Sequence, residues 1–191
     1  GTPHKMIITL TNATPFTFVL DKSARCCSKC NQHCGFSAES GKFVQGHVPP
    51  IEIRPNSSSD IHVSGRESSA VVPDGWIQYD IHDPSGNATP CKFKVNYSGA
   101  GWSSFQDKTV VECIFVGIPP IDPGGGGTVT RRVEENGARG YRVHFEIDGR
   151  NRVKAGEDPV NWEQMVCAAF RPGSASRCSG LRVLITDQTP S

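Results

Sequence analysis

Four cysteines and one histidine lie within nine positions of a short segment, where they could hold a metal ion or form disulfides. They are Cys26, Cys27, Cys30, His33 and Cys34. Cys27 and Cys30 have the spacing of half a zinc knuckle, and His33 or Cys34 would complete a tetrahedral set. Structural zinc sites usually draw on two separated pairs of ligands, whereas this segment offers no second arm. We therefore favour disulfides, which would staple a segment with too few apolar residues to pack by itself.

The chain has eight cysteines in 191 residues, an even number and far above the usual content of a cytosolic protein. This content predicts an oxidising compartment with all eight cysteines in disulfides. The other four, which fall in or next to strand-like segments, are Cys91, Cys113, Cys167 and Cys178. Sequence does not determine the connectivity, but we favour a local bridge from Cys167 to Cys178, followed by one from Cys91 to Cys113. Each bridge would contribute roughly 2 to 4 kcal/mol.

Four glycosylation sequons agree with secretion, at Asn12, Asn56, Asn87 and Asn96. The first three lie in predicted turns and Asn96 lies on the polar side of a predicted strand, positions that tolerate a glycan. The sequence begins Gly-Thr-Pro without Met and has no apolar run of the roughly 18 residues that cross a bilayer. We expect a mature extracellular protein.

The sequence offers no convincing catalytic set. It has no Gly-x-Ser-x-Gly elbow, and bridged cysteines would supply no thiolate nucleophile. His62, His82 and His144 occupy outward strand positions, where a solvated histidine is the usual outcome. The glycine run at 124–127 is followed by neither Lys-Ser nor Lys-Thr, so it does not predict a phosphate loop. We predict a protein that is not an enzyme and holds no cofactor or metal.

The charge balance excludes other function classes. Twenty Lys and Arg against nineteen Asp and Glu give a net charge of +1, which creates no field to attract nucleic acid. The length suits a single domain, and 20 glycines with 14 prolines suit many short strands joined by tight turns. We expect a monomer that does not bind nucleic acid.

Apolar and polar residues alternate through much of the chain, which predicts antiparallel strands. Residues 6–11 and 16–21 predict an opening hairpin, and segment 48–84 predicts a three-stranded β-meander. Residues 157–170 predict one short helix. Further strands are expected at 92–97, 109–116, 128–133, 141–147 and 181–186.

Together these elements predict an all-β fold, a disulfide-stapled antiparallel β-sandwich with about ten strands and at most one short helix. We expect one domain over residues 1–191, with a cysteine-rich loop insertion at 22–47 and a carboxy-terminal elaboration at 117–191. The clearest inward-facing set is Tyr141, Val143, Phe145 and Ile147.

The centre of the predicted meander resembles a known family. Its features are a strand ending in Ile53-Arg54-Pro55, a strand running into Ser64-Gly65-Arg66, a strand that Gly75 initiates, and then Asp83-Pro84-Ser85-Gly86. They resemble the aegerolysins, small secreted β-sandwich proteins of fungi and bacteria, and the resemblance extends over about residues 5–115. It implies recognition of membrane lipids by loops at one end of the sandwich, in some members with a partner protein that forms the pore.

Three aromatic residues are the candidates for such lipid binding, since aromatic rings favour the membrane interface. They are Trp76, Trp102 and Phe105. For Trp76, packing against the outer face of its own sheet is an equal alternative. The eight cysteines and the residues beyond 115 distinguish this chain from the compact, cysteine-poor aegerolysins.

A protein partner is the other hypothesis, because a stapled sandwich with long loops is a rigid scaffold for presenting them. Segment 117–132 is extended by its prolines and suited to enter another protein's cleft. Most segments of this kind, however, are surface loops without a binding role. The candidate residues are Ile118, Pro119, Pro120, Ile121, Asp122, Arg131 and Arg132. Fungal plant pathogens secrete proteins of this character, which favours an effector that binds a host extracellular protein in the apoplast. A papain-like cysteine protease is the sharpest candidate, and aegerolysin-type lipid binding is the alternative.

Overall fold

The computed structural model describes residues 4–24, 35–65, 72–100, 108–116, 129–136, 140–148 and 182–187. These residues form twelve β-strands and no helix, so the prediction of an all-β fold is confirmed for them. The helix predicted at 157–170 lies outside the described residues. Nowhere in the described ranges is there a helix long and apolar enough to cross a membrane.

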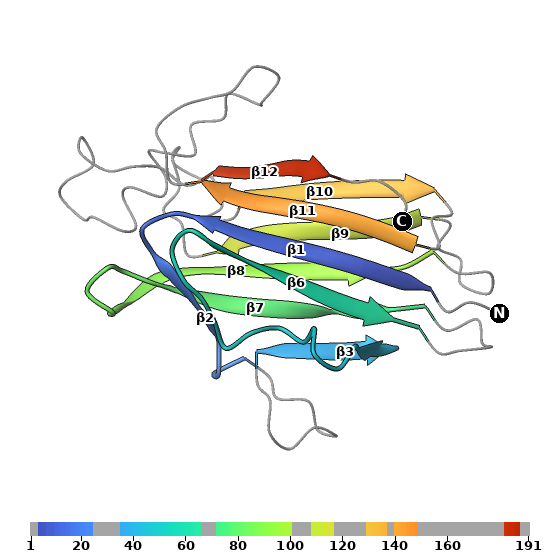
Figure 1. The fold of residues 1–191 in the computed structure, drawn as a ribbon, viewed down its shortest axis with the longest axis horizontal. Helices are drawn as coiled ribbons and strands as arrows, with labels where there is room; N and C mark the ends of the chain where they lie inside the picture. The colour runs from blue at the N-terminus through green and yellow to red at the C-terminus, as the bar shows by residue number, and fades with distance from the viewer. Residues whose placement is uncertain are drawn as a thin grey trace, which may run out of the picture.

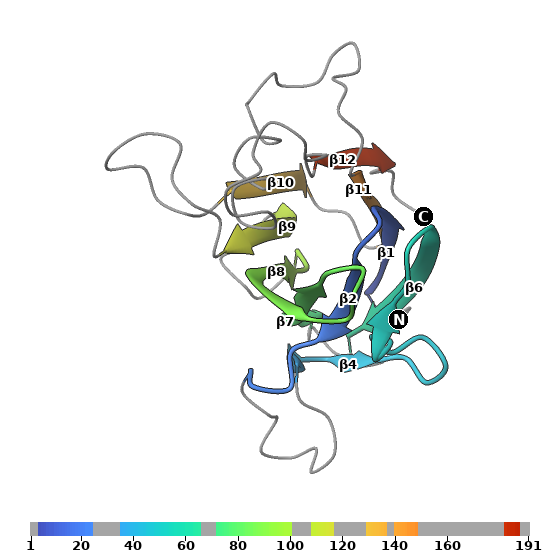
Figure 2. The same cartoon turned by 90° about the vertical axis from the view of Figure 1, so that its left-hand side faces the viewer.

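The strands form two sheets that face each other in a sandwich-like arrangement (Figures 1 and 2). The five-stranded sheet has the order β12-β11-β1-β6-β4. Its central strand, β1, pairs antiparallel with β6 and parallel with β11. The bounds are Lys5–Ala13 for β1, Lys42–Phe43 for β4, Ser57–Ser64 for β6, Gly140–Asp148 for β11 and Arg182–Asp187 for β12.

The seven-stranded sheet has the order β10-β9-β8-β7-β2-β5, with β3 paired to a further part of β7. Strands β7 to β10 follow one another along the chain and pair antiparallel with their neighbours. The bounds are Thr17–Leu20 for β2, Phe36–Ser40 for β3, Glu52–Ile53 for β5, Asp74–His82 for β7, Ala88–Ser98 for β8, Lys108–Val116 for β9 and Val129–Asn136 for β10. The strands of the carboxy-terminal part therefore extend both sheets.

The core lies between the sheets, and alternate residues of several strands build it. On β11 the inward residues are those that alternation predicts, because Tyr141, Val143, Phe145 and Ile147 are all at most 1% exposed. On β8, Phe93, Val95 and Tyr97 are likewise buried. Each fully buried side chain of this size contributes about 1.5 to 3 kcal/mol.

The predicted β-meander over segment 48–84 is wrong. Strand β6 belongs to the five-stranded sheet, whereas β5 and β7 lie on either side of β2 in the other sheet. Alternation identifies a strand and its buried face but not its partner, and both connections cross from one layer to the other. Ile51, two residues before the buried Ile53, is 68% exposed, so alternation fails at this position.

The predicted opening hairpin is also wrong, because β1 and β2 belong to different sheets. A buried corner turns the chain between them. The Asn12 amide donates through Nδ2 to the carbonyl oxygens of Phe16 at 2.7 Å and Ile53 at 3.0 Å, and its Oδ1 accepts from the Thr14 hydroxyl at 2.6 Å. Asn12 is fully buried, with both amide hydrogens used, so the prediction that it lies in a turn open to a glycan is wrong.

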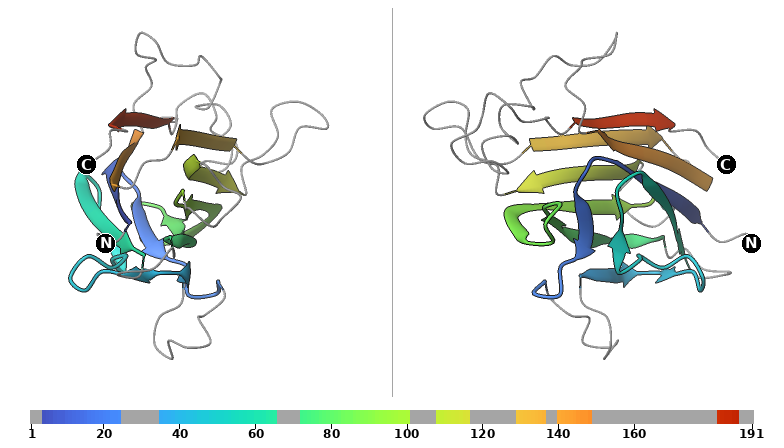
Figure 3. Two further views of the ribbon diagram at one scale, coloured as in Figure 1. Left: turned by 90° about the vertical axis from the view of Figure 1, so that its right-hand side faces the viewer. Right: turned by 60° about the vertical axis from the view of Figure 1, so that its left-hand side comes forward.

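Part of the predicted loop insertion at 22–47 is regular structure. Strand β3 pairs with β7 of one sheet and β4 pairs with β6 of the other, so together they join the two layers along one edge (Figure 3). Gly41 makes the turn between them with φ of 76°, and a Cβ there would lie 2.4 Å from the carbonyl oxygen of Ser64. Sequence reasoning took this glycine- and serine-rich stretch for a loop because its strands are short and their partners distant.

Candidate functional site

A shallow pocket of about 310 Å³ opens on the outer face of the seven-stranded sheet. One row of side chains crosses four strands beneath it: Trp76 on β7, Asn96 on β8, Glu112 on β9 and Arg132 on β10. Each is the register partner of the next. Residues directly opposite on antiparallel strands point to the same face, so the pairing itself assembles the row.

Trp76 forms an aromatic wall of the pocket. Its indole Nε1 donates a hydrogen bond of 3.3 Å to Oε1 of Glu39 on β3. The ammonium group of Lys94 lies 5.0 Å from the centre of the indole ring, within cation–π range. These two contacts fix the orientation of the half-buried indole.

Glu39 and Asp74 make the acidic end of the pocket. Both are exposed, and among the described residues neither forms an ion pair. Partial burial and the negative charge of Glu39 raise the pKa of the Asp74 carboxyl, against a smaller opposing effect of the hydrogen bond from Gly75 N–H. This end therefore carries negative charge that no described cation neutralises.

Arg132 makes the opposite end, where charges are paired. Its guanidinium lies 2.7 Å from Glu134 and 3.7 Å from Glu112, and Asn96 Nδ2 donates to Glu112 at 3.1 Å. Hydrogen bonds from Lys108 and Arg132 lower the pKa of Glu134. Exposed pairs of this kind add little stability, but they hold the side chains in place.

Gly75 and Tyr97 form part of the pocket's inner wall. A Cβ at position 75 would lie 2.2 Å from the Ser37 carbonyl oxygen and 2.5 Å from the Tyr97 hydroxyl, so only glycine fits. The Tyr97 hydroxyl is buried and has no hydrogen-bond partner among the described residues. Burial raises the pKa of Tyr97, and the nearby charges of Asp74 and Glu39 raise it further.

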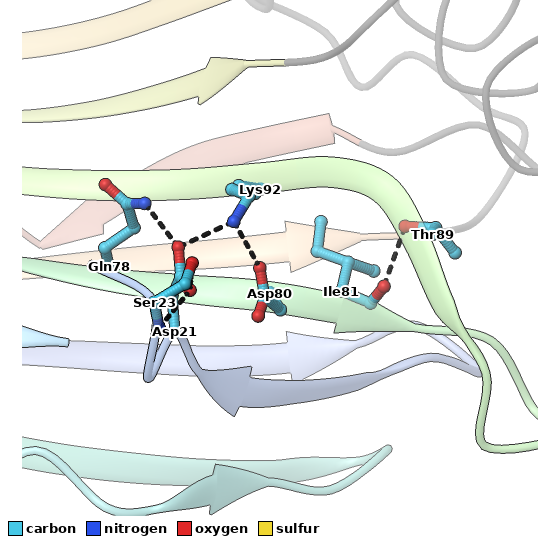
Figure 4. Close-up of polar contacts among 7 residues, drawn as sticks. All are labelled: Asp21, Ser23, Gln78, Asp80, Ile81, Thr89 and Lys92. Atoms are coloured by element: carbon cyan, nitrogen blue, oxygen red, sulfur yellow. Dashed lines mark hydrogen bonds and ion pairs between the residues drawn. The ribbon is translucent and has the colours of Figure 1, made fainter. Parts of the chain in front are cut away.

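A second charged cluster is built around Asp21, directly after β2, and its charged groups are paired with one another (Figure 4). The Asp21 carboxylate accepts hydrogen bonds from Gln78 Nε2 at 2.6 Å, Lys92 Nζ at 2.7 Å and the Ser23 hydroxyl at 2.6 Å. Lys92 also lies 3.0 Å from Asp80. Burial alone would raise the pKa of Asp21, but the hydrogen bonds led by that from Lys92 lower it well below its ordinary value. This cluster has the composition of a structural ion pair.

The Asp21 cluster also closes the base of the cysteine-rich segment. Asp21 N–H donates to the Gln78 carbonyl at 3.0 Å, and Gln78 N–H donates to the Gly35 carbonyl at 2.7 Å. Gly35 adopts φ of 96°, where a Cβ would lie 3.2 Å from the Asp21 backbone. The two ends of segment 22–34 are thus held side by side by one residue of β7.

The structure brings together two residues that were predicted for different functions. Trp76, a candidate for lipid binding, and Arg132, a candidate for protein binding, line the same pocket. Arg131 is on β10, but nothing is described of its side chain. The remaining candidates lie outside the described residues: Trp102, Phe105, Ile118, Pro119, Pro120, Ile121 and Asp122.

One disulfide prediction is wrong. Cys113 is a free thiol, fully buried, and in the β8–β9 register it lies opposite Val95, four residues along β8 from Cys91. Burial raises the pKa of the Cys113 thiol, so it stays protonated and packs as a small apolar side chain. Six cysteines lie outside the described residues: Cys26, Cys27, Cys30, Cys34, Cys167 and Cys178. In the described ranges no three potential ligands approach closely enough to hold a metal ion.

Two of the other three sequons lie where a glycan has access to solvent. Asn56 and Asn87 are exposed, and Asn87 ends the turn between β7 and β8, where its N–H donates to Oδ1 of Asp83 at 2.9 Å. Asn96 is half-buried on the polar face of β8, as predicted, and lines the pocket. Occupancy of these sequons stays a prediction.

His62, His82 and His144 all lie on outward faces, as predicted, but two of them have specific partners. The imidazole of His62 stacks on that of His47 with ring centroids 3.8 Å apart, and Nε2 of His144 lies 2.6 Å from the Thr11 hydroxyl. Burial lowers the pKa of His62, as does the proximity of His47.

Sequence reasoning missed Glu39, Asp74 and Glu112 as site residues. Only the strand register shows that Asp74, Trp76 and Glu112 converge. Glu39 could not be found this way, because β3 was not predicted.

Comparison of the chain with protein-family models gives no match, and no match was found among curated proteins. The class of protein is therefore defined by its fold and pocket alone, as an all-β protein with a mixed aromatic and charged pocket on one sheet face.

Proposed function

We propose that the protein is a secreted, non-catalytic binding protein of the effector type that engages an extracellular protein of a host. The observation that carries this proposal is the pocket on the outer face of the seven-stranded sheet, because it unites Trp76 with Arg132. Trp and Arg are the residue types most enriched among those that dominate the energy of protein interfaces.

The side chains of the pocket, taken together, favour recognition over catalysis. An indole, an amide, three carboxylates and a guanidinium provide one apolar wall and several directional hydrogen-bonding groups. Glu112, Asn96 and Arg132 are already bound to one another, which fixes their geometry before a partner arrives. Such preorganisation reduces the entropic cost of binding.

The segment between β9 and β10 belongs to the same proposed interface. Phe115 and Val129 are register partners, so segment 117–128 leaves and re-enters the sheet at one end of the β9–β10 pair. Ile118 to Asp122 lie within it. The most specific version of this proposal is that the segment enters the active-site cleft of a papain-like cysteine protease. The pocket would then receive a side chain from the protease surface.

The test is a capture experiment with the oxidised, full-length protein immobilised and exposed to a detergent-free host extracellular extract. We expect one protein to be retained, and its retention to fall at least tenfold with Trp76→Ala and Arg132→Ala. Arg54→Ala is the matched control, because Arg54 is exposed, pairs with Glu52 and does not line the pocket. Retention that is indifferent to both pocket variants and to replacement of Ile118–Asp122 by Gly and Ser would contradict the proposal.

Membrane-lipid recognition, which the aegerolysin resemblance implies, is the second candidate function. One observation favours it: Val48 and Ile51, 46% and 68% exposed, are the large apolar side chains that the described residues leave open to solvent. The same experiment with liposomes of sterol, sphingolipid and phospholipid tests this candidate. Retention of liposomes that is lost in Val48→Ser/Ile51→Ser but kept in Trp76→Ala would replace the protein-binding proposal.

A further inference from the structure

We propose that the Trp76 pocket receives a cationic side chain, lysine or arginine, from the partner protein. This inference rests on the proposed function, since it names the chemical group that the partner inserts. The cation would bind at the acidic end of the pocket, which is formed by Asp74 and by Glu39, the hydrogen-bond acceptor of the Trp76 indole.

The charge distribution selects a cation. Arg132, the cation that lines the pocket, already contacts Glu112 and Glu134, and the ammonium of nearby Lys94 lies over the Trp76 ring. Glu39 and Asp74 have no such partner among the described residues, and partial burial, followed by the negative charge of Glu39, raises the pKa of Asp74. An anionic group would meet two unpaired carboxylates here, whereas an ammonium or guanidinium would relieve the repulsion.

The pocket's size and aromatic wall select a long side chain. A volume of about 310 Å³ is at the lower limit of ligand pockets, enough for one inserted group. Lysine and arginine carry their charge on a methylene stem that packs along apolar surfaces. The stem would lie on the half-buried indole while the charged head reaches Glu39 and Asp74.

The test uses small probes on the full-length protein. Acetyl-arginine methylamide and acetyl-lysine methylamide are titrated against it, with acetyl-citrulline methylamide as the neutral isostere of arginine and methyl glucoside as an uncharged sugar. Binding is followed by the NMR signal of the Trp76 indole N–H, assigned with Trp76→Phe. We expect saturable shifts with dissociation constants on the order of 1 mM for both cationic probes, and binding at least tenfold weaker for citrulline.

Two paired variants provide the control. Glu39→Gln/Asp74→Asn should weaken binding of the arginine probe at least tenfold. Glu52→Gln/Asp60→Asn makes the same change in net charge away from the pocket and should leave the affinity within twofold. Equal binding of arginine and citrulline, preference for the glucoside, absence of a shift, or an equal effect of both double variants would each overturn the inference. Capture of a host protein through the pocket without binding of these probes would leave the proposed function standing and reject only the cationic group.

Discussion

Asp21 and Asp74 are two aspartates of the same sheet with opposite surroundings. Asp21 is 1% exposed, and its carboxylate accepts hydrogen bonds from Lys92, Gln78 and Ser23. Asp74 is exposed beside Glu39 and forms no ion pair with any described residue. The pKa of Asp21 is lowered and that of Asp74 is raised. A carboxylate with every partner in place stabilises the fold, whereas one held near a like charge lowers stability and is available to a ligand.

The largest expected effect comes from removing the cation of the paired site. Lys92→Met leaves the buried Asp21 carboxylate charged without its ammonium, and we expect a loss of about 3 kcal/mol in the free energy of unfolding at pH 7. Asp74→Asn should change it by less than about 0.5 kcal/mol, or stabilise the protein slightly. Urea unfolding of both variants measures the difference. Similar losses in the two variants would remove the distinction between the sites.

Gly75→Ala tests the wall of the unpaired site. The new methyl would press on the Ser37 carbonyl and the Tyr97 hydroxyl, so β3 must move away from β7, and we expect a loss of about 2 kcal/mol. Gly46→Ala is the control, because its methyl would meet nothing within 4 Å and only φ of 84° is strained, at a cost of about 1 kcal/mol. If Gly75→Ala destabilises the protein no more than Gly46→Ala does, the pocket wall tolerates the methyl and the prediction is wrong.

Acid titration should separate the two aspartates by the sign of their effects. The stability that Asp21 contributes is present above its ordinary pKa of about 4 and is lost as the pH falls toward its lower folded pKa. The contribution of Asp74 to stability has the opposite sign, because protonation relieves the cost of partly burying its charge and then its repulsion by Glu39. Urea midpoints between pH 6 and 3 should therefore fall less steeply in Asp21→Asn than in the wild type, and more steeply in Asp74→Asn.

The smallest expected effect lies on the other sheet, in the stacked pair of His62 and His47. The pKa of His62 is lowered by burial and by His47, with Arg142 and Lys5 acting in the same direction and Asp60 against them. Its neutral form is therefore favoured in the folded state, and stability should decline as the pH falls below about 6.5. His47→Phe keeps an aromatic ring in the stack without a second charge. The variant should show a shallower decline in urea midpoint between pH 7.5 and 5.5, and an unchanged decline would show that the stack does not matter.

Alternation in the sequence predicts the buried faces well and the neighbours poorly. It identifies Phe93, Val95 and Tyr97 as inward, because the side-chain period of a strand is a local property. The pairing of β1 with β11, and the separation of β6 from β5 and β7, depend on contacts between distant segments that no local pattern records. The pocket shows the same difference between local pattern and distant contact. Trp76 could be recognised as a candidate from its residue type, whereas Glu39 comes near it only because β3 pairs with β7.

The parallel pairing of β1 with β11 has a consequence for how the chain acquires its structure. Lys5 is the register partner of Gly140, and Ala13 of Asp148. During synthesis the first strand therefore has an unsatisfied edge until residues 140–148 have emerged. A fold dominated by such distant contacts is expected to form slowly, and truncation before residue 140 would leave a strand edge open to aggregation. In this respect the carboxy-terminal strands complete the amino-terminal one and are not an appendage to it.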